Sequence, residues 1–176
     1  LILIGAILEN GLEIDLKGEI TSRSYIKMTL KILKDIGVET RFEGNSIKIL
    51  SAASSLSNQK LDRHYHSSKI KHYTVESDWS SASYFYSLVA IGKKKMHLKS
   101  FYAHSLQGDS ALKEIYLKFF GVNTISDAGE NKITLLPDIH FQYPEKFVLD
   151  MNDCPDIAQT VCVTCVALKL PFEISG

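Results

Sequence analysis

The feature that most constrains the fold of this chain is an internal repeat. Two segments align without a gap, LKDIGVET at residues 33–40 and LKFFGVNT at residues 117–124. In each, the end of an amphipathic helix is followed by a glycine, Gly37 or Gly121, at the position where a left-handed backbone is common. A period of roughly eighty residues is too long for a short solenoid repeat and is typical of duplicated subdomains. We therefore expect one folding unit to occur more than once.

Hydrophobic spacing and turn residues indicate what that unit contains. Residues 41–50 and 125–136 each carry a hairpin signal, with turns at Gly44-Asn45 and near Gly129. The helix before each hairpin has apolar residues at helical spacing. The residues predicted to form the two buried helix faces are Ile26, Leu30, Leu33 and Ile36 in the first copy and Leu112, Ile115, Tyr116 and Phe119 in the second.

The repeat extends upstream of these helices. A helix, a glycine and a strand are predicted in residues 1–16 and again in residues 80–98, and the same pattern starts a third time in residues 155–174. Leading strands are predicted at residues 72–76 and 146–151. The expected fold class is α+β, a mixed α/β arrangement of repeated βαβαββ units with a mixed sheet under two helices.

The ends and the middle of the chain indicate how these units are divided. Residues 1–8 are typical of the back half of a buried helix and residues 171–176 of a strand that has barely begun, so we expect a fragment of a longer protein. Residues 51–71 are rich in serine and basic residues, which is typical of a long surface connection. We place a boundary near Val75. Residues 1–75 would end one domain, with helix, strand, helix, hairpin and linker 51–71, and residues 76–176 would be part of a second, with one βαβαββ unit and the start of another.

Composition excludes several classes of function. The 20 basic and 20 acidic residues cancel, so neither nucleic acid nor a membrane is an expected partner. The chain has no apolar run long enough to span a bilayer, and its three cysteines favour a reducing, cytoplasmic compartment over a disulfide framework. Because no Gly-rich phosphate loop, nucleophile elbow or set of metal ligands is present in the sequence, we expect neither a cofactor nor a metal.

Asp156 is the leading candidate for a catalytic residue. It follows Pro155 and precedes an apolar run, residues 157–170, and proline is favoured at the first position of a helix. The sequence thus predicts that Asp156 lies in the first turn of an apolar helix, beside free backbone N–H groups that hold the carboxylate ionised and in place. The alternative is that this acid only complements the helix dipole.

Four segments together resemble a known family. They are KGEITSRSYI at residues 17–26, ESDWSSASYF at 76–85, SLQGD at 105–109 and DMNDCPDIAQT at 150–160. With them the chain resembles the enolpyruvyl transferases over almost its whole length, and in particular the members of that family in the shikimate pathway. The resemblance implies an alpha-beta prism, an inside-out barrel of βαβαββ units, in a cytoplasmic transferase without cofactors.

The resemblance also implies a reaction and partners. The expected activity is transfer of the enolpyruvyl group of phosphoenolpyruvate to the 5-hydroxyl of shikimate 3-phosphate, with release of phosphate, on the route to chorismate and the aromatic amino acids. The full-length protein would be monomeric and open to a glyphosate-type inhibitor. Much of the family's ring of Lys and Arg falls outside this chain, so the isolated chain is expected to be inactive. The alternatives are a UDP-N-acetylglucosamine enolpyruvyl transferase and a βαβαββ-repeat binding protein without chemistry.

The same resemblance implies roles for four residues. Asp156 would bind the substrate through its attacking hydroxyl and accept the proton of that hydroxyl, and Ser22, Arg23 and Tyr25 would also bind the phosphorylated substrate. Arg23 and Ser24 stand where the family often has lysine and proline, which keeps the positive charge but changes its shape. From the residues alone, Ser22 fits an N-cap, Tyr25 would bury its ring in the first helical turn, and Arg23 would be solvated.

The remaining motifs are expected to be structural. Small side chains in ESDWSSAS favour close packing, with Asp78 or Ser77 as the helix cap, and SLQGD is expected to form a turn and an N-cap before Ala111. Cys162 and Cys165 lie inside an apolar run, which favours buried thiols over a redox pair or a zinc site. Three histidines near the polar connection are expected to be solvated: His64, His66 and His72.

Overall fold

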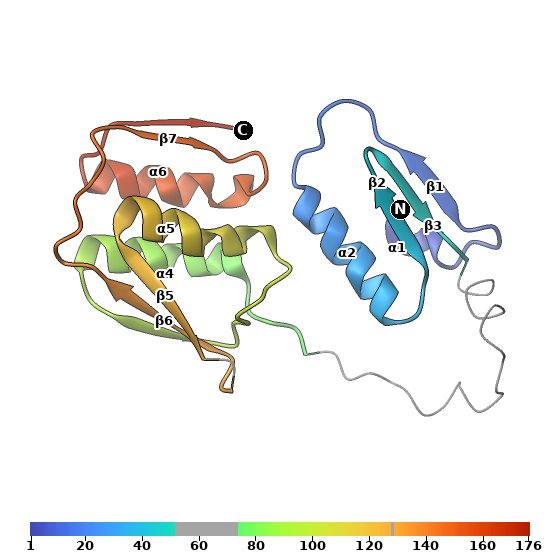
Figure 1. Ribbon diagram of the computed structural model, residues 1–176, viewed down its shortest axis with the longest axis horizontal. Coiled ribbons are helices and arrows are strands. Elements are labelled where there is room, and N and C mark those ends of the chain that lie inside the picture. The colour runs from blue at the N-terminus through green and yellow to red at the C-terminus, as the bar shows by residue number, and fades with distance from the viewer. Residues whose placement is uncertain (52–73, 128) are drawn as a thin grey trace. The chain divides into compact units, whose positions relative to one another are not determined.

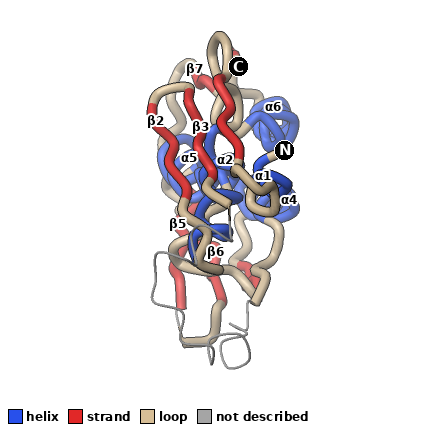
Figure 2. The backbone as a smooth tube through the Cα atoms, turned by 90° about the vertical axis from the view of Figure 1, so that its right-hand side faces the viewer, coloured by secondary structure: helices blue, strands red, loops and turns tan. Residues whose placement is uncertain are grey.

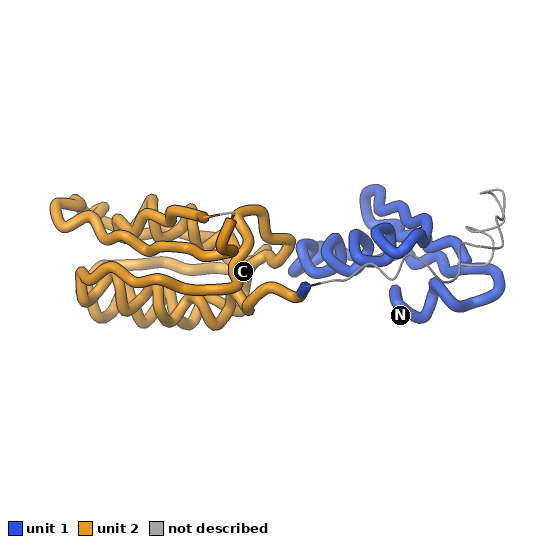
Figure 3. The backbone as a smooth tube through the Cα atoms, turned by 90° about the horizontal axis from the view of Figure 1, so that it is seen from below, with its two compact units in different colours: residues 1–74 blue, residues 75–176 orange. Residues whose placement is uncertain are grey.

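The computed structural model describes residues 1–51, 74–127 and 129–176. It contains two units, Leu1–Thr74 and Val75–Gly176, each of which is considered by itself (Figure 3). Most of the predicted connection at residues 51–71 and the three histidines expected to be solvated lie outside the described residues. The leading strand predicted at residues 72–76 is wrong for its described part, because residues 74–76 have no strand pairing.

The first unit is a three-stranded antiparallel sheet with helices. Its order is β1-β3-β2, with the hairpin β2–β3 visible in Figure 2 and Leu12 of β1 opposite Ile49 of β3. Side chains from α2, β3 and the loops near them form its core: Ala6, Leu30, Leu33, Val38, Ile47 and Ile49. The elements are α1 (Ile2–Gly5), β1 (Leu12–Asp15), α2 (Arg23–Asp35), β2 (Thr40–Glu43) and β3 (Ser46–Ile49).

The second unit repeats this sheet and adds a parallel pair of strands. The order β4-β6-β5 is antiparallel throughout, and β7 pairs with β8 in parallel. Figure 1 shows α4, α5 and α6 side by side. The elements are α4 (Trp79–Gly92), β4 (Met96–Lys99), the 3₁₀ turn η1 (Gly108–Ala111), α5 (Leu112–Phe120), β5 (Val122–Asp127), β6 (Lys132–Pro137), β7 (Phe147–Asp150), the 3₁₀ turn η2 (Pro155–Ile157), α6 (Ala158–Ala167) and β8 (Phe172–Ser175).

The predicted repeat and the α+β class are confirmed, but the predicted mixed sheet is wrong. Within the described residues both three-stranded sheets are antiparallel, and the parallel pair β7–β8 is a separate sheet. In both sheets the second hairpin strand lies between the first hairpin strand and the strand before the helix. The outer strands keep one offset in the register: Leu12 and Thr40 both lie opposite Ile49, and Met96 and Thr124 both lie opposite Leu135. Gly37 and Gly121 both have positive φ, 95° and 65°, as expected after a helix end. The two sheets are therefore built by one pattern.

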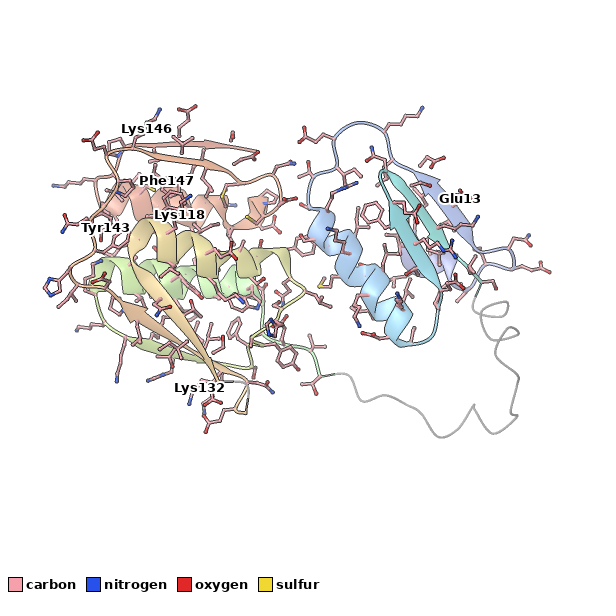
Figure 4. All side chains as sticks on the ribbon, in the orientation of Figure 1. Glu13, Lys118, Lys132, Tyr143, Lys146 and Phe147 are labelled. Carbon is pink, nitrogen blue, oxygen red and sulfur yellow. The ribbon has the colours of Figure 1, made fainter. Side chains whose placement is uncertain are left out.

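The predicted helix faces are only partly correct. Leu30 and Leu33 are buried, but Ile36 is 67% exposed, because α2 ends at Asp35 and Ile36 is its C-cap with φ −90°. In the second copy the buried residue near the helix end is Phe120, whereas Phe119 is half-buried. Phe147, the first residue of β7 (labelled in Figure 4), packs its ring against both phenylalanines, with centroids 4.4 Å from Phe119 and 5.6 Å from Phe120.

The helix expected across residues 1–8 is much shorter than predicted. α1 covers only Ile2–Gly5, and Leu3, Ile4 and Ile7 are exposed. A helix of this length is not stable by its own backbone bonds and depends on packing. Within residues 1–8 only Gly5 and Ala6 are buried, so packing against the core stabilises a single helical turn.

Candidate active site

The first group of candidate residues lies at the N-terminus of α2, in the first unit. Ser22 is the N-cap, as predicted, but it makes no side-chain cap bond and has left-handed dihedrals, φ 57° and ψ 40°. The predicted capping role is therefore wrong: a capping side chain reaches the N2 or N3 amide from an extended backbone, which Ser22 does not have. Positive φ is costly for serine, and such outliers concentrate at functional sites. The first turn of α2 contains no acidic residue, so its N–H groups remain suited to an anion.

Arg23 is tied to the turn of the β2–β3 hairpin. Its Nη2 donates to the carbonyl of Gly44 and to Asn45 Oδ1, the latter at 3.3 Å. Its guanidinium also lies over the ring of Phe42, 4.9 Å from the centroid. Arg23 is therefore half-buried and partly engaged rather than freely solvated, which corrects the expectation from sequence. A substrate phosphate would have to use its remaining N–H groups.

Tyr25 is the third candidate residue at the N-terminus of α2. Its backbone N–H donates to the carbonyl of Ser22 at 3.1 Å, and its own carbonyl accepts from the hydroxyl of Thr29 at 2.9 Å. Tyr25 is half-buried, so its ring is less covered than the sequence predicted. The structure thus gathers Ser22, Arg23 and Tyr25 within the first turn of one helix.

Asp156 belongs to the second unit and lies in η2, not in the α-helix that follows. The prediction of an α-helical first turn is wrong, because Pro155–Ile157 form a 3₁₀ turn and α6 begins at Ala158. Such 3₁₀ turns are frequent at helix ends. Asp156 is exposed, while its neighbours Cys154 and Ile157 are buried at 5% and 0% exposure. The carboxylate therefore stands on a short turn that its buried neighbours hold in place.

The loop before η2 is also fixed by backbone bonds. The Met151 N–H donates to the carbonyl of Ser175 at 2.7 Å, and the Cys154 N–H donates to the carbonyl of Met151 at 2.9 Å. Asn152 N–H donates to Asp150 Oδ1 at 2.9 Å, an Asx turn at the end of β7. Asp156 thus follows a loop that is closed onto the two parallel strands.

Each serine of the SSAS segment has its own partner, which sequence reasoning missed. Ser80 donates its hydroxyl to Asp109 of η1, and Ser81 bonds to Asp78, the cap of α4. Ser83 shares a hydrogen bond of 2.9 Å with Thr160 of α6. The segments SSAS, QGD and PDIAQT therefore meet at one end of the second unit. The only sequence signal for this was that several hydroxyl-bearing residues fall close to predicted helix starts.

The segment before α4 and the SLQGD segment are joined as well. Glu76 accepts from the indole N–H of Trp79 at 3.1 Å and from the hydroxyl of Ser105. Gln107 accepts from the Trp79 backbone N–H at 2.8 Å and donates to the carbonyl of Ser77 at 3.0 Å. Asp78 caps α4 as predicted, whereas Gln107, at the N-cap of η1, makes no side-chain cap bond there. These contacts give both motifs the structural role expected of them.

Two of the three cysteines, Cys154 and Cys165, are buried and poorly suited to chemistry. Burial raises the pKa of the Cys165 thiol to about 11, and burial, with Asp109 and two further acids nearby, raises the pKa of Cys154 to about 11. Cys165 is buried as predicted, while Cys162 is half-buried, because it lies on the side of α6 nearer solvent. A protonated thiol is a poor nucleophile and metal ligand. In the part of the chain that the structure covers, no cluster of three potential metal ligands occurs.

Among the helices of the described ranges, none has both the length and the apolar character that crossing a membrane requires.

Comparisons with known proteins agree on one family. The sequence model described as EPSP synthase (3-phosphoshikimate 1-carboxyvinyltransferase) matches residues 1–176. A relative from Bacteroides fragilis, named 3-phosphoshikimate 1-carboxyvinyltransferase, is 37% identical over 177 residues, which cover 100% of this chain and 39% of the relative. Proteins of the same name from Methanospirillum hungatei and Methanococcoides burtonii are 30% and 31% identical, over 96% and 93% of this chain and 36% and 34% of their own lengths. The chain thus spans less than half the length of the curated relatives that it matches.

Proposed function

Because the chain belongs to the EPSP synthase family, we propose that the whole protein transfers the enolpyruvyl group of phosphoenolpyruvate to the 5-hydroxyl of shikimate 3-phosphate. The placement of Asp156 is the observation that supports this proposal at the level of a single residue. Its carboxylate is exposed, ionisable and held on a turn between two buried side chains. We also propose that the two units belong to two domains. Residues 1–75 form the end of the first domain, and residues 76–176 form part of the second.

In this reaction Asp156 acts as the proton acceptor. An alcohol is a weak nucleophile until its proton is removed, and a positioned carboxylate can remove it. The freed oxygen bonds to C2 of phosphoenolpyruvate, while C3 gains a proton, to give a tetrahedral intermediate. Loss of phosphate and of a C3 proton then gives the enol ether. Because Asp156 is exposed, a substrate hydroxyl can reach its carboxylate from solvent.

We also propose that the N-terminus of α2 binds the phosphorylated substrate. The Ser22 hydroxyl makes no cap bond, and no acidic residue occupies the first turn of the helix. A helix N-terminus favours a phosphate group, because its N–H groups and its dipole both attract an anion. Arg23 adds positive charge and Tyr25 a phenol to the same turn.

Asp156→Asn in the whole protein tests this proposal. Asparagine is nearly isosteric with aspartate, so the fold should persist, while loss of a general base should lower turnover by roughly a hundred- to ten-thousandfold. If Asp156 only complements the helix dipole, the change should instead lower stability by about 0.3–1 kcal/mol and leave the rate intact. Phosphate release with both substrates and the urea midpoint, measured on the same variant, separate the two roles. Near-normal turnover with a lowered midpoint contradicts the catalytic assignment.

A further inference from the structure

Buried hydroxyl groups, and not apolar contacts alone, connect α4 to α6. Ser83 of α4 and Thr160 of α6 are 2.9 Å apart, and they are only 1% and 7% exposed. One helical turn farther along both helices, Thr164 lies 2.8 Å from Ser87. We call these two contacts the hydroxyl ladder. Because its two rungs are one turn apart, α6 can neither rotate nor slide against α4 without breaking at least one of them.

The direction of the first rung follows from a count of protons. A serine hydroxyl has one proton, and that of Ser83 is directed at the carbonyl of Ser80, 2.6 Å away. In the contact between Ser83 and Thr160, the donor must then be Thr160. The hydroxyl of Thr164 is also 2.8 Å from the Tyr116 hydroxyl of α5, so three helices meet at the second rung. Buried polar networks of this kind fix one arrangement when every member is satisfied.

We propose that Thr160 and Ser83 are positioning residues for Asp156, through the placement of α6 on α4. This inference rests on the proposed role of Asp156 as proton acceptor. Thr160 follows Asp156 by four residues. A backbone hydrogen bond connects η2 to the start of α6, because the Ala158 N–H donates to the carbonyl of Pro155. A shift of α6 on α4 therefore moves η2 and the carboxylate with it. Proton transfer depends on hydrogen-bond geometry, so a small shift costs rate.

Thr160→Val in the whole protein removes the first rung at nearly constant side-chain volume. We expect kcat to fall by roughly ten- to a hundredfold, since misplacement of a reacting group by about 1 Å can have that effect. KM for both substrates should change less than kcat, because proton transfer depends more steeply on hydrogen-bond geometry than substrate binding does. Thr160→Ser keeps the hydroxyl and should restore most of the rate.

Thr124→Val is the matched control. Thr124 bonds to the buried Tyr86 hydroxyl at 2.6 Å and joins α4 to β5, so the same kind of bond is lost in the same unit without loosening α6. We expect a similar fall in the urea midpoint but no comparable fall in kcat. If Thr160→Val fails to fold, Ser83→Ala removes the same rung from the other helix and decides the question.

The outcomes separate this inference from the proposed function. If Asp156→Asn turns over normally, the proposed role of Asp156 fails. If Asp156→Asn is impaired but Thr160→Val and Ser83→Ala lose no more kcat than Thr124→Val, the positioning role is overturned while the role of Asp156 stands. A fall in kcat that Thr160→Ser fails to restore also counts against the positioning role.

Discussion

Gly121→Ala should destabilise the second unit by about 2–5 kcal/mol. Two separate costs make up this value. Gly121 is the C-cap of α5 with φ 65° and ψ 34°, and a left-handed backbone costs a residue with a side chain roughly 1–2 kcal/mol. A Cβ at this position would also lie 2.5 Å from Phe141 Cβ and 2.7 Å from its Cδ2, and overpacking of that kind typically costs about 1–3 kcal/mol.

Urea denaturation followed by Trp79 fluorescence measures this loss. Trp79 is the only tryptophan of the chain and is fully buried in the core of the second unit, so its emission reports on that unit. Phe141→Ala supplies the second arm of a double-mutant cycle. In that background the contacts with the ring are lost, although alanine keeps the Cβ, so the cost of Gly121→Ala should fall toward the backbone cost of roughly 1–2 kcal/mol.

Gly44→Ala is the control for the backbone cost alone. Gly44 has φ 57°, and within the described residues no atom lies within 4 Å of a Cβ placed there. Far-UV circular dichroism should follow its loss of roughly 1–2 kcal/mol, because Trp79 belongs to the other unit. The reasoning is refuted if Gly121→Ala costs less than about 1 kcal/mol, or if its cost is the same with and without Phe141.

Two further predictions concern ionisable groups. The pKa of Asp78 is lowered by hydrogen bonds from Ser81 and the first-turn amides of α4. Its ionised form therefore adds stability that is present above the ordinary value of 3.8 and is lost as the pH falls through the lower, folded-state pKa. Asp78→Asn should be less stable than the parent chain at pH 7 and equal to it in strong acid, and a difference in urea midpoint that persists at the lowest pH contradicts this. Iodoacetamide at pH 8 should modify half-buried Cys162 well before Cys154 and Cys165, since burial raises the pKa of both of these thiols to about 11. Peptide mapping by mass spectrometry gives the order of modification. Equal labelling of Cys162 and Cys165 would show that burial does not protect Cys165 from the reagent.

Local features of the fold could be predicted from the sequence. Gly44-Asn45 between two short alternating segments was enough to predict the first hairpin, and Asp78 before a helical run was enough to predict a cap. The alignment of residues 33–40 with 117–124 carried the topology of one sheet over to the other. These signals depend on neighbours in sequence, so no tertiary contact is needed to interpret them.

The details of the site depend on contacts that the sequence does not reveal. Ser83 and Thr160 are separated by 77 residues, and nothing in either segment indicates that the other is its partner. Likewise, the engagement of Arg23 with the hairpin turn depends on how α2 lies on the sheet. The aligned residues Leu33 and Leu117 show the same limit, since one is buried and the other is 51% exposed. Two residues at the same position of a repeated pattern can therefore lie on different faces of their helices, one toward the core and the other toward solvent.

The strand order has a consequence for synthesis on the ribosome. In each three-stranded sheet the central strand, β3 or β6, is the last of the three in the chain, and among the described residues both outer strands pair only with it. Translation runs from the N-terminus, so the outer strands leave the ribosome before the strand that joins them. Neither sheet can begin to assemble in the nascent chain until its own last strand, Ser46–Ile49 or Lys132–Pro137, has been made.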